Sequence, residues 1–264
     1  RMLSRGIRTF MLKVQYRMHP AIAAYPSKAF YAGALLSGTP PSARRAPMGF
    51  DWPVPAVPLA FVDVPDGYER SDGSSQTNPV EAQKIVNIVK KLAASHDVIF
   101  GEIGVVTPYS AQVRAIKRLL NGNKPEIRSR FDAPADPNTI QALEVCSVDG
   151  FQGREKEVIV FCCTRANPNG NVGFLADPRR VNVMLTRARR GLIIIGNLGT
   201  LRRDPEVWGP WLQWAGDNGL ICGLAAADAD AASRLATIGM SSLEEIGGRG
   251  AGEVMTMGAM LSPT

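Results

Sequence analysis

The 264-residue chain has few residues that commonly bind metal: two histidines and four cysteines, none of them in C-x-x-C spacing. Three of the cysteines lie in or beside apolar runs, which indicates buried, reduced thiols. The cysteines are Cys146, Cys162, Cys163 and Cys222. We therefore expect neither a zinc site nor any other metal site formed by this chain alone.

Two further patterns are missing from the sequence. No apolar run approaches the ~18 residues of a membrane span, so we expect no membrane partner. The G-x-x-x-x-G-K-[ST] loop that cradles nucleotide phosphates is also absent. If the chain handles phosphate, its contribution must come from other residues. We find no internal repeat either.

Positive charge is in excess, with a net charge of +6 and a pI near 9.3. Residues 224–264 hold five acidic and two basic residues, so the rest of the chain carries +9 against −3 for this segment. A basic body suggests a polyanionic partner, most simply nucleic acid. The alternative, a charge that serves solubility alone, stays open at this point.

Short apolar segments alternate with helical patterns along the chain. The segments are apolar on both faces, which is typical of a buried parallel strand. We therefore predict an α/β fold, a parallel sheet with helices on both faces. Strands are expected at residues 9–14, 59–64, 103–106, 145–148, 158–163 and 192–196. Helices are expected at 20–31 (with a break or new turn at Pro26), at 178–187 and at 206–218. Two more are expected between these: one that begins at position 79, and a separate one, after position 110, that ends near position 120.

Composition also suggests boundaries. Residues 39–58 are rich in proline and predict an extended loop, and residues 65–78 predict a mobile polar loop. Another polar loop is expected at 121–138. We predict one domain over residues 1–223 and a low-complexity, disordered tail at 224–264. The chain starts abruptly with an apparent incoming strand, so we expect it to be cut from a longer protein.

Polar clusters follow position 14, position 106 and position 148, and another lies beside the last helix and strand. In open parallel sheets, sites form beyond the carboxyl ends of the strands. We therefore expect the four clusters to converge at one edge of the sheet.

Two arginines in these clusters have the chemistry to grip a phosphate. Arg17 stands between a strand and a helix, and Arg187 stands just before the last strand. Their planar guanidinium groups can bind phosphate oxygens through two hydrogen bonds. Without a phosphate loop of its own, the chain would supply this charge to a nucleotide held elsewhere, as arginine fingers worth about 10³–10⁵ in rate. Ordinary surface ion pairs are the alternative.

Other side chains suit a nucleotide as well. Glu155 could accept hydrogen bonds from a ribose, or simply pair with the neighbouring Arg154 or Lys156. Tyr16 could stack on a base or lie in the core. The amides of Gln15 and Gln152 could contact nucleotide or nucleic acid. The histidine at position 19, before a proline at a helix start, indicates local capping rather than catalysis.

Small and hydroxyl-bearing residues recur at successive strand ends: Thr107, Tyr109, Ser147, Asp149 and Gly150. Such groups can hold a nucleic-acid backbone through neutral donors. Gly150 and Gly153 permit a close approach of phosphate to the main chain. Tight turns and helix caps explain each residue singly but explain their recurrence less well.

Four motifs, in this order, resemble the superfamily 1 RNA/DNA helicases of the up-frameshift type, the helicases of nonsense-mediated decay. They are Gln-Tyr-Arg-Met-His-Pro at 15–20, Val-Thr-Pro-Tyr at 106–109, Ser-Val-Asp-Gly-Phe-Gln-Gly-Arg-Glu-Lys at 147–156, and the segment 173–189. The resemblance spans about residues 7–222. It implies a RecA-like fold, the second of two motor domains.

The resemblance also implies roles for individual residues. Tyr16 would stack on adenine, Glu155 would meet the ribose, and Arg17 and Arg187 would approach the γ-phosphate. Gln15, Gln152 and Gly153 would help to position the nucleotide or couple it to RNA. The single strand would lie along Thr107, Pro108, Tyr109, Ser147 and Asp149.

What the chain lacks follows from the same resemblance. ATP and Mg²⁺ would be bound mainly by a preceding RecA-like domain that is missing here. The implied partners are that domain, single-stranded RNA and decay factors, in the cytoplasm or the nucleus. The implied activity is ATP-driven translocation and unwinding, with this chain inactive alone. A DNA helicase of the same family and a catalytically inactive binding platform are the alternatives.

Overall fold

A computed structural model describes residues 11–122 and 139–222. Its centre is a five-stranded sheet in which every neighbouring pair of strands is parallel, in the order β3-β9-β8-β6-β7. The strands are β3 (Leu59–Asp63), β6 (Ile103–Thr107), β7 (Glu144–Ser147), β8 (Lys156–Cys162) and β9 (Ala188–Gly196). Five of the six predicted strands are confirmed, and so is the parallel sheet.

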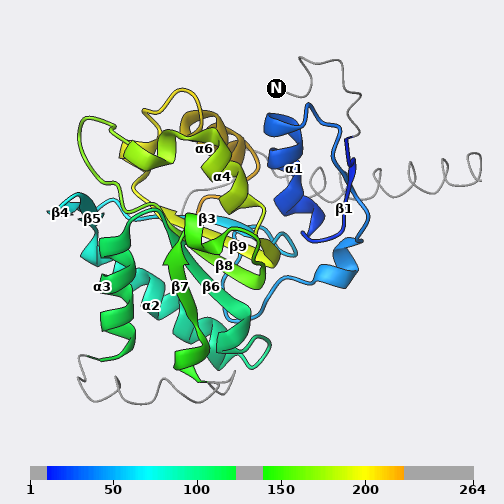
Figure 1. Cartoon of the computed structure of the whole chain (residues 1–264). Helices are drawn as coiled ribbons and strands as arrows, with labels where there is room; N and C mark the ends of the chain where they lie inside the picture. Colours follow the sequence, from blue (N-terminus) through cyan, green and yellow to red (C-terminus); the bar gives the residue numbers. More distant parts are fainter. Residues whose placement is uncertain (1–10, 123–138, 223–264) are drawn as a thin grey trace, which may run out of the picture.

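Helices cover both faces of this sheet (Figure 1). Alternate side chains of β8 show why: Ile159 and Phe161 face one apolar cluster, while Val158 and Val160 face the other. The first cluster packs against α1 (Pro20–Phe30), α4 (Pro178–Leu185) and α6 (Trp208–Asp217), and the second against α2 (Pro79–Ala94) and α3 (Ser110–Leu120). A short helix, α5 (Leu198–Leu201), precedes α6. The predicted α/β architecture is confirmed.

Three details differ from the sequence-based expectation. The incoming strand is shorter, β1 (Val14–Gln15), and pairs with β2 (Leu36–Ser37) in a separate two-stranded sheet. Helix α1 runs through Pro26 without a break, because the helix is anchored by its buried face. Residues 70–77 form a hairpin of β4 (Arg70–Asp72) and β5 (Ser75–Thr77) rather than a loop.

The hairpin has a local cause. Gly73, with φ +61°, stands first in a two-residue turn, where hairpins favour glycine. The Ser75 hydroxyl accepts a hydrogen bond of 3.1 Å from the backbone N–H of Ala111, which fixes the hairpin to the start of α3. Most of the predicted loop at 121–138 and the predicted tail lie outside the described residues. In the two described ranges no helix is long and apolar enough to cross a membrane.

His19 caps helix α1, as predicted. Its Nδ1 accepts a hydrogen bond of 3.1 Å from the backbone N–H of Ala21. The residue is buried, and this burial lowers the pKa of its imidazole from 6.5 to about 4. The folded protein therefore holds a neutral histidine at neutral pH.

This pKa predicts an acid-sensitive term in stability. Between pH 6.5 and pH 4 the unfolded chain binds a proton at His19 that the folded chain does not. The free energy of unfolding should therefore fall by up to about 3 kcal/mol as the pH drops through this window, and not change above it on account of this group. His19→Asn keeps a capping acceptor and should remove that loss. Urea titrations of both proteins across the window measure it, and parallel curves would contradict the assignment.

Candidate functional site

The polar clusters lie at two opposite edges of the sheet, not at one. Thr107 and Ser147 end their strands and lie at the carboxyl edge. Glu155 and Arg187 directly precede β8 and β9, so in a parallel sheet they lie at the amino edge. The expected convergence of all four clusters is therefore wrong. Glu155 and Arg187, which were predicted to contact nucleotide, lie at the amino edge, whereas Thr107 and Ser147, which were predicted to contact nucleic acid, lie at the carboxyl edge.

At the amino edge three predicted residues come together, and we call Arg17, Glu155 and Arg187 the amino-edge cluster. The Arg17 Nε donates to a carboxylate oxygen of Glu155 in a short ion pair. The Arg17 Nη1 donates to the carbonyl oxygen of Thr186 at 3.0 Å. Arg17 is thereby held beside the residue that precedes Arg187, across 169 positions of sequence.

Arg187 is held from the end of α4. Its Nε donates to the Val183 carbonyl oxygen at 2.9 Å, and its Nη2 donates to the Thr186 hydroxyl at 3.0 Å. Partial burial lowers the pKa of its guanidinium, and the positive charge of Arg17 lowers this pKa further. Two like charges close together on a half-buried surface favour an anionic ligand between them.

Glu155 is also shaped by this cluster. Its hydrogen bond from Arg17 lowers the pKa of its carboxyl group, with smaller contributions from nearby arginines. Arg154 and Lys156, the neighbours considered as its partners, both pair with Glu144 instead. Glu155 therefore faces the arginines, and its side chain stays 42% exposed and reachable by a ligand.

The segment before Arg17 is organised by Gln15. Its side-chain oxygen accepts hydrogen bonds from the backbone N–H groups of Arg17 (3.0 Å) and Met18 (2.8 Å). Its side-chain nitrogen donates to the Ser37 hydroxyl at 2.9 Å. Gln15 thus positions the loop, and its predicted nucleotide contact remains a prediction. Tyr16 is 65% exposed, which excludes the core alternative and leaves its ring free to stack.

At the carboxyl edge the predicted residues differ in access. Thr107 is fully buried, and its hydroxyl lies 3.0 Å from that of Thr164, so it supports the edge rather than contacting a strand. Pro108 is half-buried. Tyr109 is 2% exposed, and its hydroxyl accepts from Arg165 at 3.3 Å. Direct contact by Thr107 is therefore corrected to a positioning role.

Ser147 and Asp149 stand at the end of β7. The Ser147 hydroxyl accepts a hydrogen bond of 3.2 Å from the backbone N–H of Gly150. It therefore caps a tight turn, which was the structural alternative to a nucleic-acid contact. The side chain of Asp149 is 72% exposed and lies 3.5 Å from the guanidinium of Arg180. Their contact with nucleic acid remains a prediction.

Residues 148–155 connect the two edges, and we call them the crossover. β7 ends at the carboxyl edge and β8 starts at the amino edge, so this segment must pass across β6. Phe151, at its centre, is fully buried. A Cβ atom at Gly104 would lie 2.9 Å from the Phe151 ring, so only glycine lets the crossover lie this close to β6. Gln152 is exposed, and Gly153 has φ +81°, which favours glycine there.

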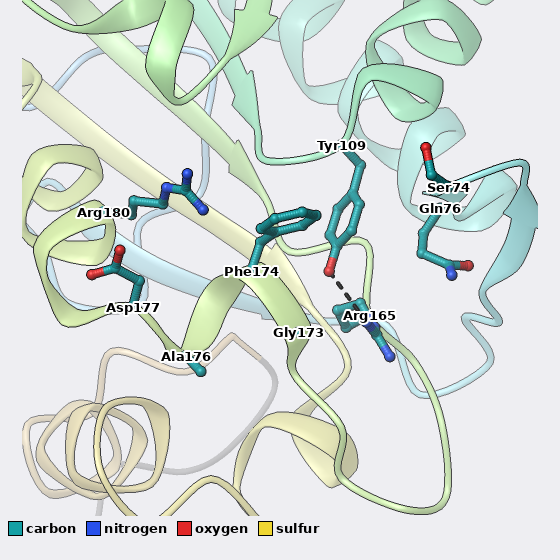
Figure 2. Close-up of a pocket in the computed structure, with 9 residues that line it drawn as sticks. All are labelled: Ser74, Gln76, Tyr109, Arg165, Gly173, Phe174, Ala176, Asp177 and Arg180. Atoms are coloured by element: carbon teal, nitrogen blue, oxygen red, sulfur yellow. Dashed lines mark hydrogen bonds between the residues drawn. The ribbon is translucent and has the colours of Figure 1, made fainter.

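A groove of about 540 Å³ opens at the carboxyl edge (Figure 2). Of the residues that line it, only Tyr109 was predicted as a site residue, although five others lie in the motif at 173–189. The lining residues are Ser74, Gln76, Tyr109, Arg165, Gly173, Phe174, Ala176, Asp177 and Arg180. Phe174 is 50% exposed, and its ring meets that of Tyr109 edge-on at 5.7 Å. The Gly-Ser pair at 73–74 was a signal for the hairpin that forms one wall. A lone aromatic in an Asn- and Gly-rich loop gave no such signal.

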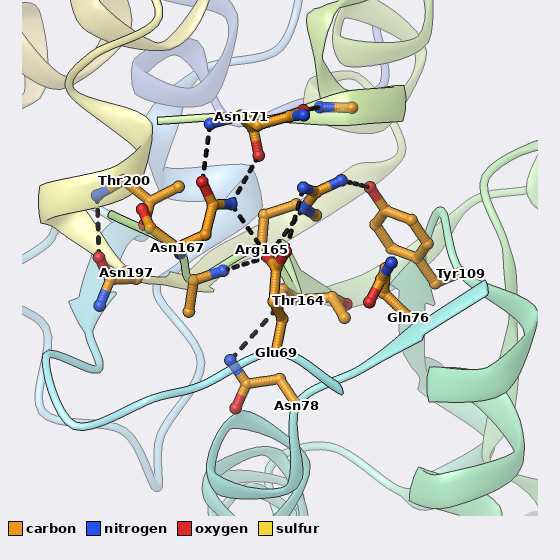
Figure 3. Close-up of polar contacts among 12 residues, drawn as sticks. Glu69, Gln76, Asn78, Tyr109, Thr164, Arg165, Asn167, Asn171, Asn197 and Thr200 are labelled. Atoms are coloured by element: carbon orange, nitrogen blue, oxygen red, sulfur yellow. Dashed lines mark hydrogen bonds and ion pairs between the residues drawn. The ribbon is translucent and has the colours of Figure 1, made fainter. Parts of the chain in front are cut away.

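A polar network surrounds Arg165, one of the residues that line this groove (Figure 3). Arg165 pairs with Glu69 through two hydrogen bonds of 2.9 and 3.1 Å. The same carboxylate accepts from the side chain of Asn167 at 3.1 Å. Glu81 is fully buried, and its carboxylate accepts a hydrogen bond of 2.7 Å from the backbone N–H of Thr164, the residue before Arg165. Burial raises the pKa of Glu81 to about 8.

The amino-edge cluster, together with Tyr16, has side chains suited to the phosphates, the ribose and the base of a nucleoside triphosphate. Two guanidinium groups can bind phosphate oxygens, an exposed carboxylate can accept from ribose hydroxyls, and an exposed tyrosine ring can stack on a base. No group of three His, Cys, Asp or Glu side chains suited to a metal ion occurs within 11–122 and 139–222. Arg17, Arg187, Glu155 and Tyr16 are chemically suited to contact a nucleoside triphosphate.

Comparisons with known proteins show what this chain is similar to. Residues 1–199 match the family described as AAA domain. The chain is 36% identical over 223 residues to the "Regulator of nonsense transcripts 1 homolog" of Drosophila melanogaster, covering 84% of this chain and 18% of that protein. It is 41% identical over 212 residues to the "Putative regulator of nonsense transcripts 1" of Takifugu rubripes, covering 78% and 18%.

Two further similarities complete the picture. The "ATP-dependent helicase NAM7" of Saccharomyces cerevisiae is 39% identical over 209 residues, which cover 77% of this chain and 20% of that protein. Among solved structures, the C-terminal domain of a possible DNA helicase from Lactobacillus plantarum matches with a TM-score of 0.41 and 11% identity, over 69% of this chain and 88% of that one.

The chain spans no more than a fifth of the length of these curated relatives. The family match over residues 1–199 covers Arg17, Glu155 and Arg187 at the amino edge and the segments at the carboxyl edge. The chain belongs to the AAA-domain family and is similar over most of its length to proteins named as regulators of nonsense transcripts 1.

Proposed function

We propose that this chain is the C-terminal motor half of an ATP-dependent RNA helicase that acts in nonsense-mediated mRNA decay. The observation that carries the proposal is the amino-edge cluster, in which Arg17 meets Glu155, 138 positions away, and Thr186 beside Arg187, 169 positions away. A domain with a purely structural role has no need of two neighbouring arginines whose positive charges repel each other. Relatives named as regulators of nonsense transcripts support the pathway.

In the proposed mechanism this domain closes on a preceding RecA-like domain that holds ATP and Mg²⁺. Bound ATP would supply the phosphoryl group whose hydrolysis drives the motor. Arg17 and Arg187 would stabilise negative charge on the terminal phosphate, and Tyr16 would stack on the adenine. Glu155, which binds Arg17 here, would accept from the ribose once a phosphate competes for that arginine.

The carboxyl edge would hold a single strand of RNA while the amino edge holds nucleotide. The crossover joins the two edges, so a change at one is transmitted to the other through eight residues, 148–155. Further proposed partners are the preceding RecA-like domain and decay factors, in the cytoplasm or the nucleus. A DNA helicase is the second candidate, because neutral strand-end contacts do not report on the 2′-hydroxyl.

We expect this chain to hydrolyse ATP negligibly by itself, because it has no phosphate loop. Turnover should appear in the full-length protein and rise when single-stranded RNA is added. A phosphate-release assay on both proteins, with a Lys→Ala change in the full-length phosphate loop as the control for contamination, measures this. RNA-stimulated hydrolysis by the purified chain alone would overturn the division of labour. RNA and DNA duplexes compared as unwinding substrates decide between the two candidates.

A further inference from the structure

We propose that the groove between Tyr109, Phe174 and Arg180 holds one unstacked base of a single strand, with the base on the ring of Phe174. Neither the sequence nor the relatives assign a ligand to this groove. The proposal rests on the proposed function, since it requires a single strand at the carboxyl edge. It adds the place where the strand is gripped through a base rather than through its backbone.

Phe174 is an exposed aromatic held in a fixed position. Next to it, a Cβ atom at Gly173 would lie 2.5 Å from an Arg165 nitrogen and 2.8 Å from the Tyr109 hydroxyl, so the turn lies against both side chains. On its other side, Leu175 is buried, and its carbonyl oxygen accepts from the Trp208 indole at 3.0 Å. The turn is fixed on both sides of Phe174, while half of that residue faces solvent.

The loop before this turn is braced as well. Asn167 accepts from the backbone N–H of Asn171 at 2.9 Å and donates to its carbonyl oxygen at 2.8 Å. The Asn171 side chain in turn accepts from the backbone N–H of Gly173 at 3.0 Å. Such bracing lowers the entropy lost on binding, which is the usual benefit of a preorganised site. It serves no evident purpose for the hydrophobic core, from which Phe174 points away.

Arg180 lies over the exposed ring. Its guanidinium group stands near the Phe174 ring (Figure 2), with the guanidinium carbon 5.4 Å from the ring centroid. Its Nη2 is 3.5 Å from the Asp149 carboxylate. Guanidinium groups stack on bases as they do on aromatic rings and also bind phosphate. Arg180 can therefore contact the phosphate beside a base that stacks on Phe174, or cover that base once its side chain moves off the ring. The ion pair places this contact next to Asp149, a predicted strand contact.

The remaining lining favours a flat, polar-edged ligand. The charge of Arg165 is balanced by its two hydrogen bonds to Glu69. Arg180 has a weaker ion pair, with Asp149 at 3.5 Å, so its positive charge is the one available to a ligand in the groove. Gln76, Ser74 and Asp177 line the groove with amide, hydroxyl and carboxylate groups, which can bond the edges of a base. A volume of about 540 Å³ is within the range of small-ligand sites. Aromatic face, single cation and polar rim together match one nucleotide of a strand.

An abasic scan tests the proposal in this chain. A set of single-stranded oligonucleotides, each lacking one base, is measured by fluorescence anisotropy against the wild-type chain. We expect a position-specific loss of affinity at one site in the strand, by about 5-fold to 150-fold, the effect of removing one base-aromatic stack. Phe174→Ala should weaken the intact strand by a similar factor and lose that position dependence. Phe174→Trp should keep both.

Tyr68→Ala is the matched control, because Tyr68 also carries an arginine over its exposed ring, at 4.8 Å from Arg70, but does not line the groove. It should bind like the wild type. A flat wild-type scan, or a Phe174→Ala variant that keeps the position-specific loss, overturns the base site while leaving the proposed function intact. Failure of the wild-type chain to bind any strand contradicts both. RNA and DNA versions of the set show whether the site needs the ribose.

Discussion

Replacing Arg187 by alanine in the full-length protein is expected to lower ATP turnover by about 10³–10⁵-fold, the usual effect of losing an arginine finger. RNA affinity should stay within a few-fold of wild type, because Arg187 precedes β9 at the amino edge and the groove lies at the carboxyl edge. Arg187→Lys should remain defective, since a lysine lacks the planar fork that binds two phosphate oxygens. Steady-state ATPase and RNA anisotropy, measured on the same preparations, check both expectations.

Arg190 provides the control for this experiment. It lies three residues further along, and its Nη2 pairs with Asp97 at 2.7 Å, away from the amino-edge cluster. Arg190→Ala should therefore retain turnover close to wild type. Loss of turnover in both variants would indicate a general disturbance of β9. Loss of RNA binding with normal turnover in Arg187→Ala would reverse the assignment of the two edges.

Replacing Phe151 by alanine is expected to reduce the free energy of unfolding of this chain by about 3–5 kcal/mol, because it empties a fully buried aromatic site. The functional effect should be specific. With its central side chain gone, the crossover is no longer fixed against β6 at Gly104, so RNA should stimulate the full-length ATPase much less than in wild type. Urea unfolding of the chain and RNA titration of the ATPase measure the two effects.

Phe161→Ala separates stability from coupling. Phe161 is 1% exposed, belongs to the same apolar cluster and stacks on Trp208, but it lies on β8 and outside the crossover. We expect a similar loss of stability and a preserved RNA stimulation at temperatures where both variants stay folded. Equal stimulation in the two variants would mean that the crossover carries no signal between the edges.

The strands and helices were predictable because burial on both faces leaves a plain pattern. The run at 158–163 is apolar throughout and becomes β8, between β6 and β9 in the sheet. The amino-edge cluster was predictable in its membership but not in its place. Glu155 and Arg187 stand before their strands, and a residue before a parallel strand lies at the amino edge. Grouping all strand ends together ignored this direction.

The groove could not be predicted from the sequence, for a different reason. Its walls come from the hairpin at 70–77 and, about 100 positions later, from the turn at Gly173 and the start of α4, which meet the hairpin only through tertiary contacts. The bidentate pair of Arg165 with Glu69, 96 positions away, has no local signature. The burial of Thr107 could not be predicted from the sequence either, because it depends on Thr164, whose hydroxyl forms a hydrogen bond with that of Thr107. Local patterns specify elements, whereas the pairing of distant side chains depends on the finished fold.

The central claim is that one edge of the sheet serves nucleotide and the other serves the strand. It is tested most directly by measuring ATP turnover at saturating RNA, together with RNA affinity, in full-length Arg187→Ala and Phe174→Ala proteins side by side. We predict that Arg187→Ala loses turnover and keeps RNA affinity, while Phe174→Ala loses affinity and keeps turnover once RNA is saturating. Two variants that lose both properties in equal measure would contradict the claim.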